Sequence, residues 1–223
     1  MRIVLAGAHG QIALRLGRRL AARGDSVLGI VRNPDHAPDL TEAGMAPAVL
    51  DLEQASVDAV AQLLIGADAV VFAAGAGPGS GLARKDTVDR AAAVLLADAA
   101  QQAGVRRYLL VSSMGVESVR DGATPAGVDE VFVAYLRAKL AAEVDLLARD
   151  LDVTVLRPGR LTDDPGTGAI TLATSAARGD IPRDDVADVL AALLDTPATS
   201  GLVLELVAGS TPVANAVRAV LAP

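Results

Sequence analysis

The stretch Met1-Arg-Ile-Val-Leu-Ala-Gly-Ala-His-Gly-Gln-Ile-Ala13 decides the fold that this chain of 223 residues is expected to adopt. An apolar run at residues 3–6 stops at Gly7, and a second glycine follows at Gly10. From residue 11 onward the apolar side chains recur at helical spacing. The stretch therefore predicts a β-strand, a tight turn and the first turn of a helix.

Such a turn is suited to a phosphate group. Backbone N–H groups at the N-terminus of a helix lack intrahelical partners, and the helix dipole adds partial positive charge there. Glycine lets the chain turn sharply and approach an anion closely, and the spacing here is G-x-x-G-x-x-A. A glycine-rich turn that binds no ligand is the alternative for this stretch taken alone. The residues predicted to contact the phosphates are Gly7, His9, Gly10, Gln11 and Ile12.

Composition argues against several classes of function. The chain is 52% apolar and has a formal net charge of −7, which argues against general binding of nucleic acid or anionic membrane. There is no cysteine, and His9 and His36 lie far apart in the sequence, so we expect no disulfide and no metal site. No segment approaches the roughly 20 apolar residues of a membrane span, and the first apolar run is too short for a signal peptide. We expect a soluble cytoplasmic protein whose oligomeric state, monomer or homodimer, stays open.

Predicted strands and helices alternate along the chain. With right-handed crossovers, this alternation gives a parallel sheet covered on both faces. We therefore predict an α/β protein with a Rossmann-like, doubly wound parallel sheet, in a single domain over residues 1–223. Residues 157–223 are expected to form a small C-terminal lobe on the substrate side. The predicted strands are 3–6, 26–31, 48–50, 69–74, 108–111, 153–156 and 202–207; the predicted helices are 11–23, 56–64, 86–103, 129–150, 184–194 and a last helix from 211; the segments expected to be irregular are 33–44, 75–81, 114–128 and 161–179.

Arg32 indicates which dinucleotide the turn would hold. Ligands of such sheets bind at the carboxyl ends of the strands, and Arg32 follows the second predicted strand. Proteins that prefer NAD(H) carry an acidic residue there for the ribose 2′-hydroxyl. A guanidinium suits a 2′-phosphate instead, so the sequence predicts NADP(H) as the cofactor. A solvated arginine at the end of a strand is the alternative.

Two more strand ends are expected to border the cofactor. Asp51 follows the third predicted strand, where two interpretations have nearly equal weight: it contacts the adenine, or it is the N-cap of the next helix. The turn Ala73-Ala74-Gly75 follows the fourth strand and is small enough for the cofactor to lie against it.

Tyr135 and Lys139 are the candidate catalytic pair. They are one helical turn apart, so they share a face of the predicted helix, and we expect them along the margin of its buried stripe, facing a cleft. An ammonium beside a phenol favours the phenolate, which makes tyrosine a usable proton donor or acceptor. An amphipathic helix with a tyrosine at its edge is the alternative. The predicted buried stripe consists of Leu136, Leu140, Val144 and Leu147.

Ser113 is the third candidate for the catalytic site. It closes the fifth predicted strand at the ligand-binding edge, where its hydroxyl can donate a hydrogen bond to a substrate carbonyl oxygen. Ser112 is the neighbouring candidate, because strand alternation sends only one of the two side chains into the cleft. We favour Ser113.

These motifs occur in an order found in a known family. The chain resembles, along essentially its whole length, an atypical short-chain dehydrogenase/reductase of the NAD(P)H-binding, NmrA-like and biliverdin-reductase-B-like group. Ala13 stands where the family's glycine pattern often has a third glycine. The segments that carry the resemblance are Gly7-Ala-His-Gly10-Gln-Ile, Arg32, Asp51-Leu52, Ser112-Ser-Met-Gly115, Tyr135-x-x-x-Lys139, Leu156-Arg-Pro-Gly159 and Ile181-Pro-Arg-Asp-Asp-Val-Ala187.

The resemblance implies a division of roles along the chain. Ser113, Tyr135 and Lys139 would act in catalysis, and Tyr135 and Lys139 would also contact the cofactor. The other residues implied in NADP(H) binding, besides the glycine loop and Arg32, are Asp51, Leu52, Ala73, Ala74, Gly75, Pro158, Gly159 and Arg160.

The predicted function is reduction of a small carbonyl or conjugated substrate by hydride transfer from NADP(H). One alternative is a non-catalytic regulatory protein that senses NADP(H), because members of this group are known without demonstrated turnover. A less favoured alternative is an epimerase or isomerase that uses tightly bound NAD(P). The identity of the small-molecule substrate cannot be derived from the motifs.

Overall fold

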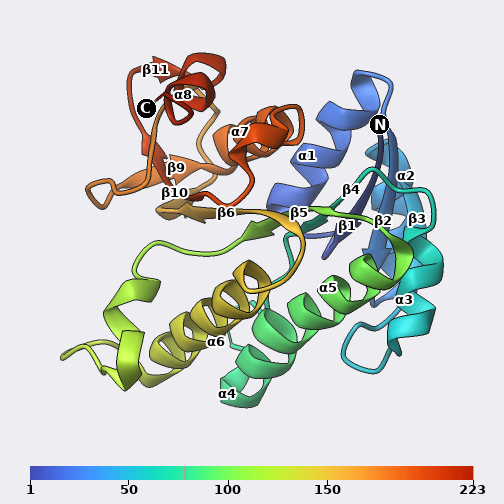
Figure 1. The fold of residues 1–223 in the computed structure, drawn as a ribbon, viewed down its shortest axis with the longest axis horizontal. Helices are drawn as coiled ribbons and strands as arrows, with labels where there is room; N and C mark the ends of the chain where they lie inside the picture. Colours follow the sequence, from blue (N-terminus) through green and yellow to red (C-terminus); the bar gives the residue numbers. More distant parts are fainter. Residues whose placement is uncertain (78, 223) are drawn as a thin grey trace.

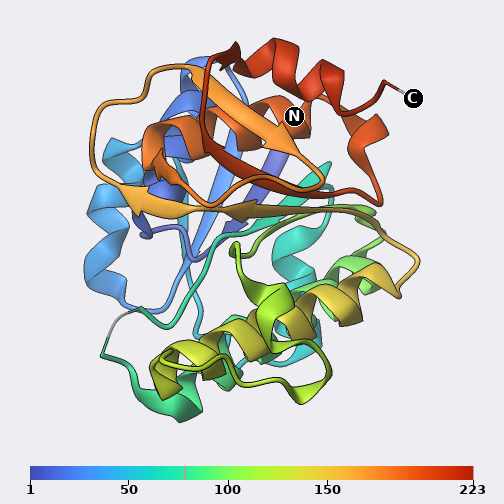
Figure 2. The ribbon, with the colours of Figure 1, turned by 90° about the vertical axis from the view of Figure 1, so that its left-hand side faces the viewer.

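The computed structural model describes residues 1–77 and 79–222 and shows a central sheet covered by helices on both faces (Figures 1 and 2). The strands are β1 (Arg2–Ala6), β2 (Ser26–Val31), β3 (Ala46–Val49), β4 (Ala69–Phe72), β5 (Arg107–Val111), β6 (Asp152–Pro158), β7 (Arg160–Thr162), β8 (Ala169–Ala173), β9 (Asp180–Pro182), β10 (Val203–Ala208) and β11 (Thr211–Pro212). The α-helices are α1 (Gln11–Ala22), α2 (Ala37–Glu42), α3 (Val57–Leu64), α4 (Gly81–Arg84), α5 (Ala92–Ala103), α6 (Glu130–Leu147), α7 (Arg183–Leu194) and α8 (Val213–Ala219). A π-helix spans Lys85–Ala91, and 3₁₀ segments span Pro34–His36, Val116–Gly122 and Pro197–Thr199.

The strand order is that of a Rossmann-like sheet, as predicted. Within the described residues, nine strands form one sheet in the order β11-β8-β10-β6-β5-β4-β1-β2-β3. Neighbours from β3 to β10 are parallel, whereas β8 runs antiparallel to β10 and β11. The chain leaves β1 toward β2 on one side and later returns to β4 on the other. The carboxyl ends of β1 and β4 therefore border the crevice in which such sheets bind ligands.

Helices cover the two faces of this sheet in separate groups. Helices α1 and α7 pack together on one face, and α3, α5 and α6 cover the other (Figures 1 and 2). Strand side chains alternate between the two resulting cores. Leu5, Val71 and Leu109 face the α1–α7 side, whereas Val70 and Tyr108 face the α3–α5 side.

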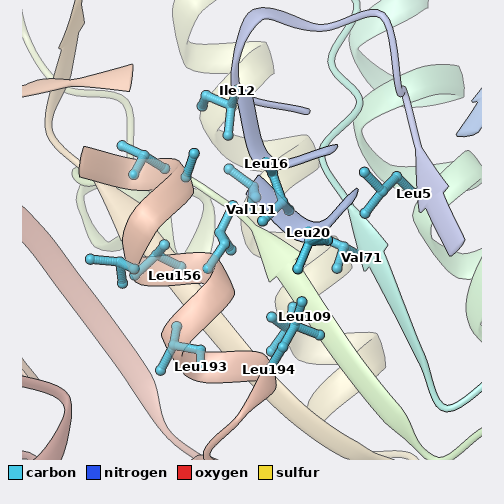
Figure 3. Close-up of a cluster of buried hydrophobic side chains, with 14 of the residues drawn as sticks. Leu5, Ile12, Leu16, Leu20, Val71, Leu109, Val111, Leu156, Leu193 and Leu194 are labelled. Carbon is cyan, nitrogen blue, oxygen red and sulfur yellow. The ribbon is translucent and has the colours of Figure 1, made fainter. Parts of the chain in front are cut away.

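The core under α1 and α7 consists almost entirely of aliphatic side chains. Leu16 and Leu20 of α1 and Leu193 and Leu194 of α7 belong to one buried cluster with residues of the strands (Figure 3). Burial of this apolar surface is the main favourable term in folding. The low aromatic content of the chain, 2%, is therefore compatible with a continuous core.

Several segments that we expected to be irregular contain regular structure. Residues 33–44 include the short helix α2, whose second residue is Pro38, a residue that the first turn of a helix tolerates. Residues 161–179 include β8, which pairs with β10, and β9 lies next to them and pairs with β7. These strands are short, and their partners are distant in sequence, so local periodicity could not reveal them.

The helix expected at 86–103 begins earlier and is interrupted. Helix α4 begins at Gly81, and the π-helix Lys85–Ala91 precedes α5. The expectation of irregular structure over 75–81 is therefore wrong at its last residue; it also included Pro78, which lies outside the described residues.

In the part of the chain that the structure describes, no helix combines the length and apolarity needed to cross a membrane.

The predicted buried stripe of α6 is partly wrong. Leu136 is buried, but Val144 is 56% exposed and Leu147 is 39% exposed. The buried face instead carries two charged residues, Lys139 and Glu143, which are 3% and 1% exposed. Both have ionic partners on other elements, and sequence periodicity treats charged residues as solvent-facing.

We expect Leu109→Ala to destabilise the fold by about 2–5 kcal/mol, because it removes a buried side chain from the core between the sheet and α1–α7. Urea unfolding followed by circular dichroism measures this change. Val144→Ala, on the exposed face of α6, is the control and should alter stability by no more than about 0.5 kcal/mol. Equal effects in the two variants would contradict this description of the core.

Candidate functional site

Two cavities adjoin at the carboxyl edge of the sheet. The smaller, of about 300 Å³, lies over the ends of β1, β2 and β3, and the larger, of about 1360 Å³, lies over the ends of β4, β5 and β6. Gly10 and the turn 73–75 line both cavities. Every residue that the sequence nominated for the site lines at least one of them. An elongated molecule could therefore lie across the glycine turn with one end in each cavity.

Gly7 is held where no other residue fits. Its φ is +76°, and a Cβ atom would lie 2.5 Å from Cα of Ala74. Gly10 precedes α1 without a side-chain cap, and the first turn of α1 contains no acidic residue. The first turn of α1 therefore offers amide groups and partial positive charge at the junction of the two cavities, which fits a pyrophosphate.

The side chains near this turn have partners of their own. Nε2 of His9 lies 2.7 Å from Oδ2 of Asp39, and the His9 ring stacks on His36 at a centroid distance of 3.6 Å. Oε1 of Gln11 accepts a hydrogen bond from Arg15 at 2.7 Å. The backbone of this loop, more than its side chains, is thus available to a ligand.

Arg32 lies at the smaller cavity and shares a carboxylate with a second arginine. Nη1 of Arg32 donates to Oε2 of Glu53 at 3.1 Å, and Nη2 of Arg84 donates to the same oxygen at 2.6 Å. Thr87 donates to the other oxygen at 2.6 Å. The hydrogen bond from Arg84 is the main cause that lowers the pKa of Glu53 from its usual value. Two guanidinium groups thus surround one carboxylate at this corner, and the carboxylate of Asp51 lines the same cavity.

Sequence reasoning missed Glu53 and Arg84. Glu53 could have been suspected because it stands two residues beyond Asp51, but Arg84 reaches the cavity only through the fold. Asp51 accepts a hydrogen bond from the Glu53 amide at 3.0 Å, and Ser56 caps α3 through the Ala59 amide at 3.2 Å. The interpretation of Asp51 as N-cap of that helix is therefore wrong. Asp51 lines the smaller cavity, as do Leu52 and the turn 73–75.

Lys139 is buried at the floor of the larger cavity. Its Nζ donates to the carbonyl oxygens of Ala74 at 3.2 Å and Val111 at 3.0 Å, and lies 3.3 Å from Oδ1 of Asp89. The same nitrogen lies 5.9 Å from the centroid of the Tyr135 ring. Tyr135 is half-buried and lines the cavity one helical turn before Lys139. The pair is therefore brought together, but Lys139 lies on the buried face of α6 and not at its margin.

Asp89 is the partner that sequence reasoning missed. It is 0% exposed, lies in the π-helix, and accepts a hydrogen bond from the Ala76 amide at 3.2 Å. The local pattern gives no signal for this contact, because Asp89 and Lys139 are fifty residues apart and belong to different helices. The ion pair joins the π-helix to α6, and the hydrogen bond from the Ala76 amide joins Asp89 to the turn after β4.

The two serines at the end of β5 differ in their surroundings. Ser112 is buried, and its hydroxyl donates to the carboxylate of Glu143. Ser113 is half-buried, and its hydroxyl donates to the carbonyl oxygen of Met114 at 3.1 Å. Both line the larger cavity, but the hydroxyl of Ser113 has the weaker and more replaceable partner. This difference supports the choice of Ser113.

A buried ionic cluster anchors the segment that follows β5. Nε of Arg157 lies 3.0 Å from Oε1 of Glu143, and its Nη2 donates to Glu117 at 2.7 Å. Glu117 belongs to the 3₁₀ segment 116–122, inside the segment 114–128 that we expected to be irregular. Hydrogen bonds from Arg120 and then Arg157 lower the pKa of Glu117 to about 2. The cluster holds this segment against β6.

The turn after β6 forms the far wall of the larger cavity. A Cβ atom at Gly159 would collide with the carbonyl oxygen of Gly179, so this position must be glycine. Arg160 is largely exposed, and its guanidinium pairs with Asp180. Pro158 accepts a hydrogen bond from the Met114 amide at 3.0 Å, which joins this wall to the end of β5.

Residues 7–197 match a family model described as NAD(P)H-binding. The chain belongs to this NAD(P)H-binding family. The predicted resemblance to atypical short-chain dehydrogenases/reductases is confirmed.

Over residues 1–77 and 79–222, no group of three or more histidine, aspartate or glutamate side chains is placed to hold a metal ion.

Relatives of this NAD(P)H-binding protein have been named as epimerases and as reductases. Over 219 residues it is 35% identical to the Uncharacterized sugar epimerase YhfK of Bacillus subtilis, covering 98% of this chain and 99% of that protein. A Bacillus halodurans structure described as an NAD-dependent epimerase/dehydratase matches with a TM-score of 0.89 at 33% identity, covering 98% and 99% of the two chains. The structure of ChuY, an anaerobillin reductase from Escherichia coli O157:H7, matches with a TM-score of 0.79 at 26% identity, covering 93% and 97%.

We expect Arg157→Met to lower the free energy of unfolding by about 3–5 kcal/mol, because it leaves the Glu143 carboxylate buried without its counter-ion. Denaturant unfolding measures the loss. The double variant Arg157→Met with Glu143→Met is the matched control and should recover most of the stability, since no unpaired charge is then buried. A single variant that loses less than about 1 kcal/mol would contradict this role.

Proposed function

We propose that this protein is an NADP(H)-dependent oxidoreductase that reduces a small carbonyl or conjugated compound. The observation that carries the proposal is the position of Tyr135 and Lys139 in the larger cavity, which Ser113 and Gly10 of the glycine turn also line. A dinucleotide lying across Gly7 and Gly10 would bring its nicotinamide end toward these side chains.

One cofactor molecule would extend across both cavities. The amide groups of the first turn of α1 would hold the pyrophosphate, and Arg32 would hold a ribose 2′-phosphate in the smaller cavity. Because Arg32 is half exposed, its ion pair with Glu53 is worth little and can be exchanged for a phosphate. NADP(H), when bound, supplies or accepts the hydride. We assign residues 157–223 to the substrate-side lobe, since its turns 158–161 and 178–183 line the larger cavity.

The chain's own groups would supply the proton transfer. Ser113 would donate a hydrogen bond to the substrate carbonyl oxygen, a contact that strengthens as negative charge develops there. Tyr135 would donate its phenolic proton to that oxygen. Lys139 would stabilise the resulting phenolate and contact the cofactor ribose.

A second candidate function is epimerisation with a tightly bound NAD(P). The descriptions of the Bacillus subtilis and Bacillus halodurans relatives favour it, whereas the description of ChuY favours reduction. Net oxidation of NADPH distinguishes the two, since an epimerase regenerates its cofactor in each turnover.

We expect Tyr135→Phe to lower kcat/KM by about 100- to 10,000-fold, because it removes the proton donor while keeping the ring. Oxidation of NADPH with a panel of aldehydes, quinones and flavins measures the rates. Binding of NADPH, followed by its fluorescence, should change little and serves as the control for folding. Equal rates in the variant and the wild type would remove Tyr135 from the mechanism.

We expect Arg32→Asp to weaken NADPH binding by about 1.5–3 kcal/mol, roughly 10- to 150-fold, because a charged hydrogen-bond donor to the 2′-phosphate is lost. Titration calorimetry with NADPH and NADH measures the change, and NADH affinity should not fall. Arg106→Asp makes the same change of charge before β5, at the opposite edge of the sheet, and is the matched control. Unchanged NADPH affinity in Arg32→Asp would end the assignment of NADP(H).

A further inference from the structure

The carboxylate of Glu53 joins two arginines that reach the smaller cavity from distant parts of the chain. Arg32 follows β2, whereas Arg84 is the last residue of α4, the short helix after β4. Nη1 of Arg32 and Nη2 of Arg84 both donate to Oε2 of Glu53, at 3.1 Å and 2.6 Å. All three side chains line the cavity. The two guanidinium groups therefore converge on the position of a single anionic oxygen.

The carboxylate of Glu53 has little capacity left for a further hydrogen bond. Besides the two donors to Oε2, the hydroxyl of Thr87 donates to Oε1 at 2.6 Å, and Nε of Arg84 lies 3.5 Å from the same oxygen. A carboxylate offers about four lone-pair sites, and these four contacts account for them. Glu53 is therefore poorly suited to accept a ribose hydroxyl, which is the contact that an acidic residue makes with NAD(H).

Exposure and charge at this cavity indicate what an incoming phosphate would meet. The side chains of Arg32 and Arg84 are 54% and 35% exposed, whereas that of Glu53 is 17% exposed, so the guanidinium groups are the more accessible. Among the described residues that line the cavity, Asp51 supplies the other carboxylate, and apart from the two histidines the charges balance. A phosphate monoester carries a charge of about −1.5 to −2 at pH 7. It gains a positive environment here only if the carboxylate of Glu53 gives way.

We propose that Glu53 is a specificity-determining residue, whose carboxylate occupies the position of the cofactor 2′-phosphate in the free protein. Arg84 is then the second guanidinium, beside Arg32, that the phosphate engages when it displaces this carboxylate. The inference rests on the proposed function in placing a dinucleotide across the two cavities. Displacing Glu53 breaks its ion pair with each arginine, and only a cofactor that carries the 2′-phosphate regains both contacts. Glu53 thereby lowers the affinity for NADP(H) without a matching effect on NAD(H).

Two adenine nucleotides test this inference without a nicotinamide ring or a substrate. The nucleotides 2′,5′-ADP and 5′-AMP differ only in the 2′-phosphate, and titration calorimetry with each gives the ratio of the two affinities. A residue that only supports the fold would change both affinities alike. The ratio therefore reports the contact with the 2′-phosphate.

We expect Glu53→Gln to tighten binding of 2′,5′-ADP by about 3- to 10-fold, because a partly exposed carboxylate that competes with the phosphate is lost. Binding of 5′-AMP should stay within about twofold. Thr87→Val releases Oε1 of Glu53 without changing any charge, so it should act in the same direction more weakly. Circular dichroism establishes that each variant is folded, and Thr87→Val replaces Glu53→Gln if the latter does not fold.

We expect Arg84→Gln to weaken binding of 2′,5′-ADP by about 10-fold or more, because a charged donor to the phosphate is lost. Binding of 5′-AMP should again change by less than about twofold. Arg90→Gln is the matched control, since Arg90 belongs to the π-helix that follows α4 and pairs there with Asp86. It should leave both affinities unchanged.

A ratio of affinities that stays the same or falls in folded Glu53→Gln would overturn the inference. Weaker binding of 5′-AMP in that variant would also overturn it, because Glu53 would then contact the ribose. An Arg84→Gln variant that binds 2′,5′-ADP like the wild type would have the same consequence. A wild type that does not prefer 2′,5′-ADP would instead refute the assignment of NADP(H). A preference gained in Glu53→Gln would still support the role of Glu53, so the two failures are distinguishable.

Discussion

The buried contact between Lys139 and Asp89 is the interaction on which the candidate site depends. One ammonium group joins the carbonyl oxygen of Ala74, in the turn after β4, and that of Val111, at the end of β5, to a carboxylate of the π-helix. It thereby fixes α6 over the crevice and places Tyr135, one turn earlier, at the larger cavity. Removing either partner would bury an uncompensated charge, which is why such a pair constrains the geometry more than it adds to stability.

A second buried pair repeats this arrangement one turn further along α6. Glu143 pairs with Arg157 of β6, and Arg157 also holds Glu117 of the segment after β5. The two pairs give α6 a polar buried face between the sheet and the cavity wall. The hydroxyl of Ser112 donates its hydrogen bond to Glu143 of this cluster, whereas the hydroxyl of Ser113 donates to a backbone carbonyl oxygen, a partner that a ligand can replace more easily.

At the other end of the crevice, the backbone at the glycine turn sets the shape of the cavities, and side chains at the ends of the strands set the charge of the smaller one. Gly7 brings the backbone against Ala74 so closely that no Cβ atom fits, which leaves the first turn of α1 facing the cavities. Arg32 and Arg84 surround Glu53 in the smaller cavity. An incoming phosphate would compete with Glu53 for Arg32, so cofactor preference depends on a balance among these three side chains.

The sequence by itself determined the alternation of strands and helices, the glycine turn and the spacing of Tyr135 and Lys139, because each is encoded within a few neighbouring residues. Only the tertiary structure decided that β8 pairs with β10, that Val144 and Leu147 face outward, and that Asp89 and Lys85 meet the helix of Tyr135. These features join residues tens of positions apart. Local periodicity predicts which side of a helix or strand is apolar. It does not predict which charged residue is buried or which distant residue forms an ion pair with it.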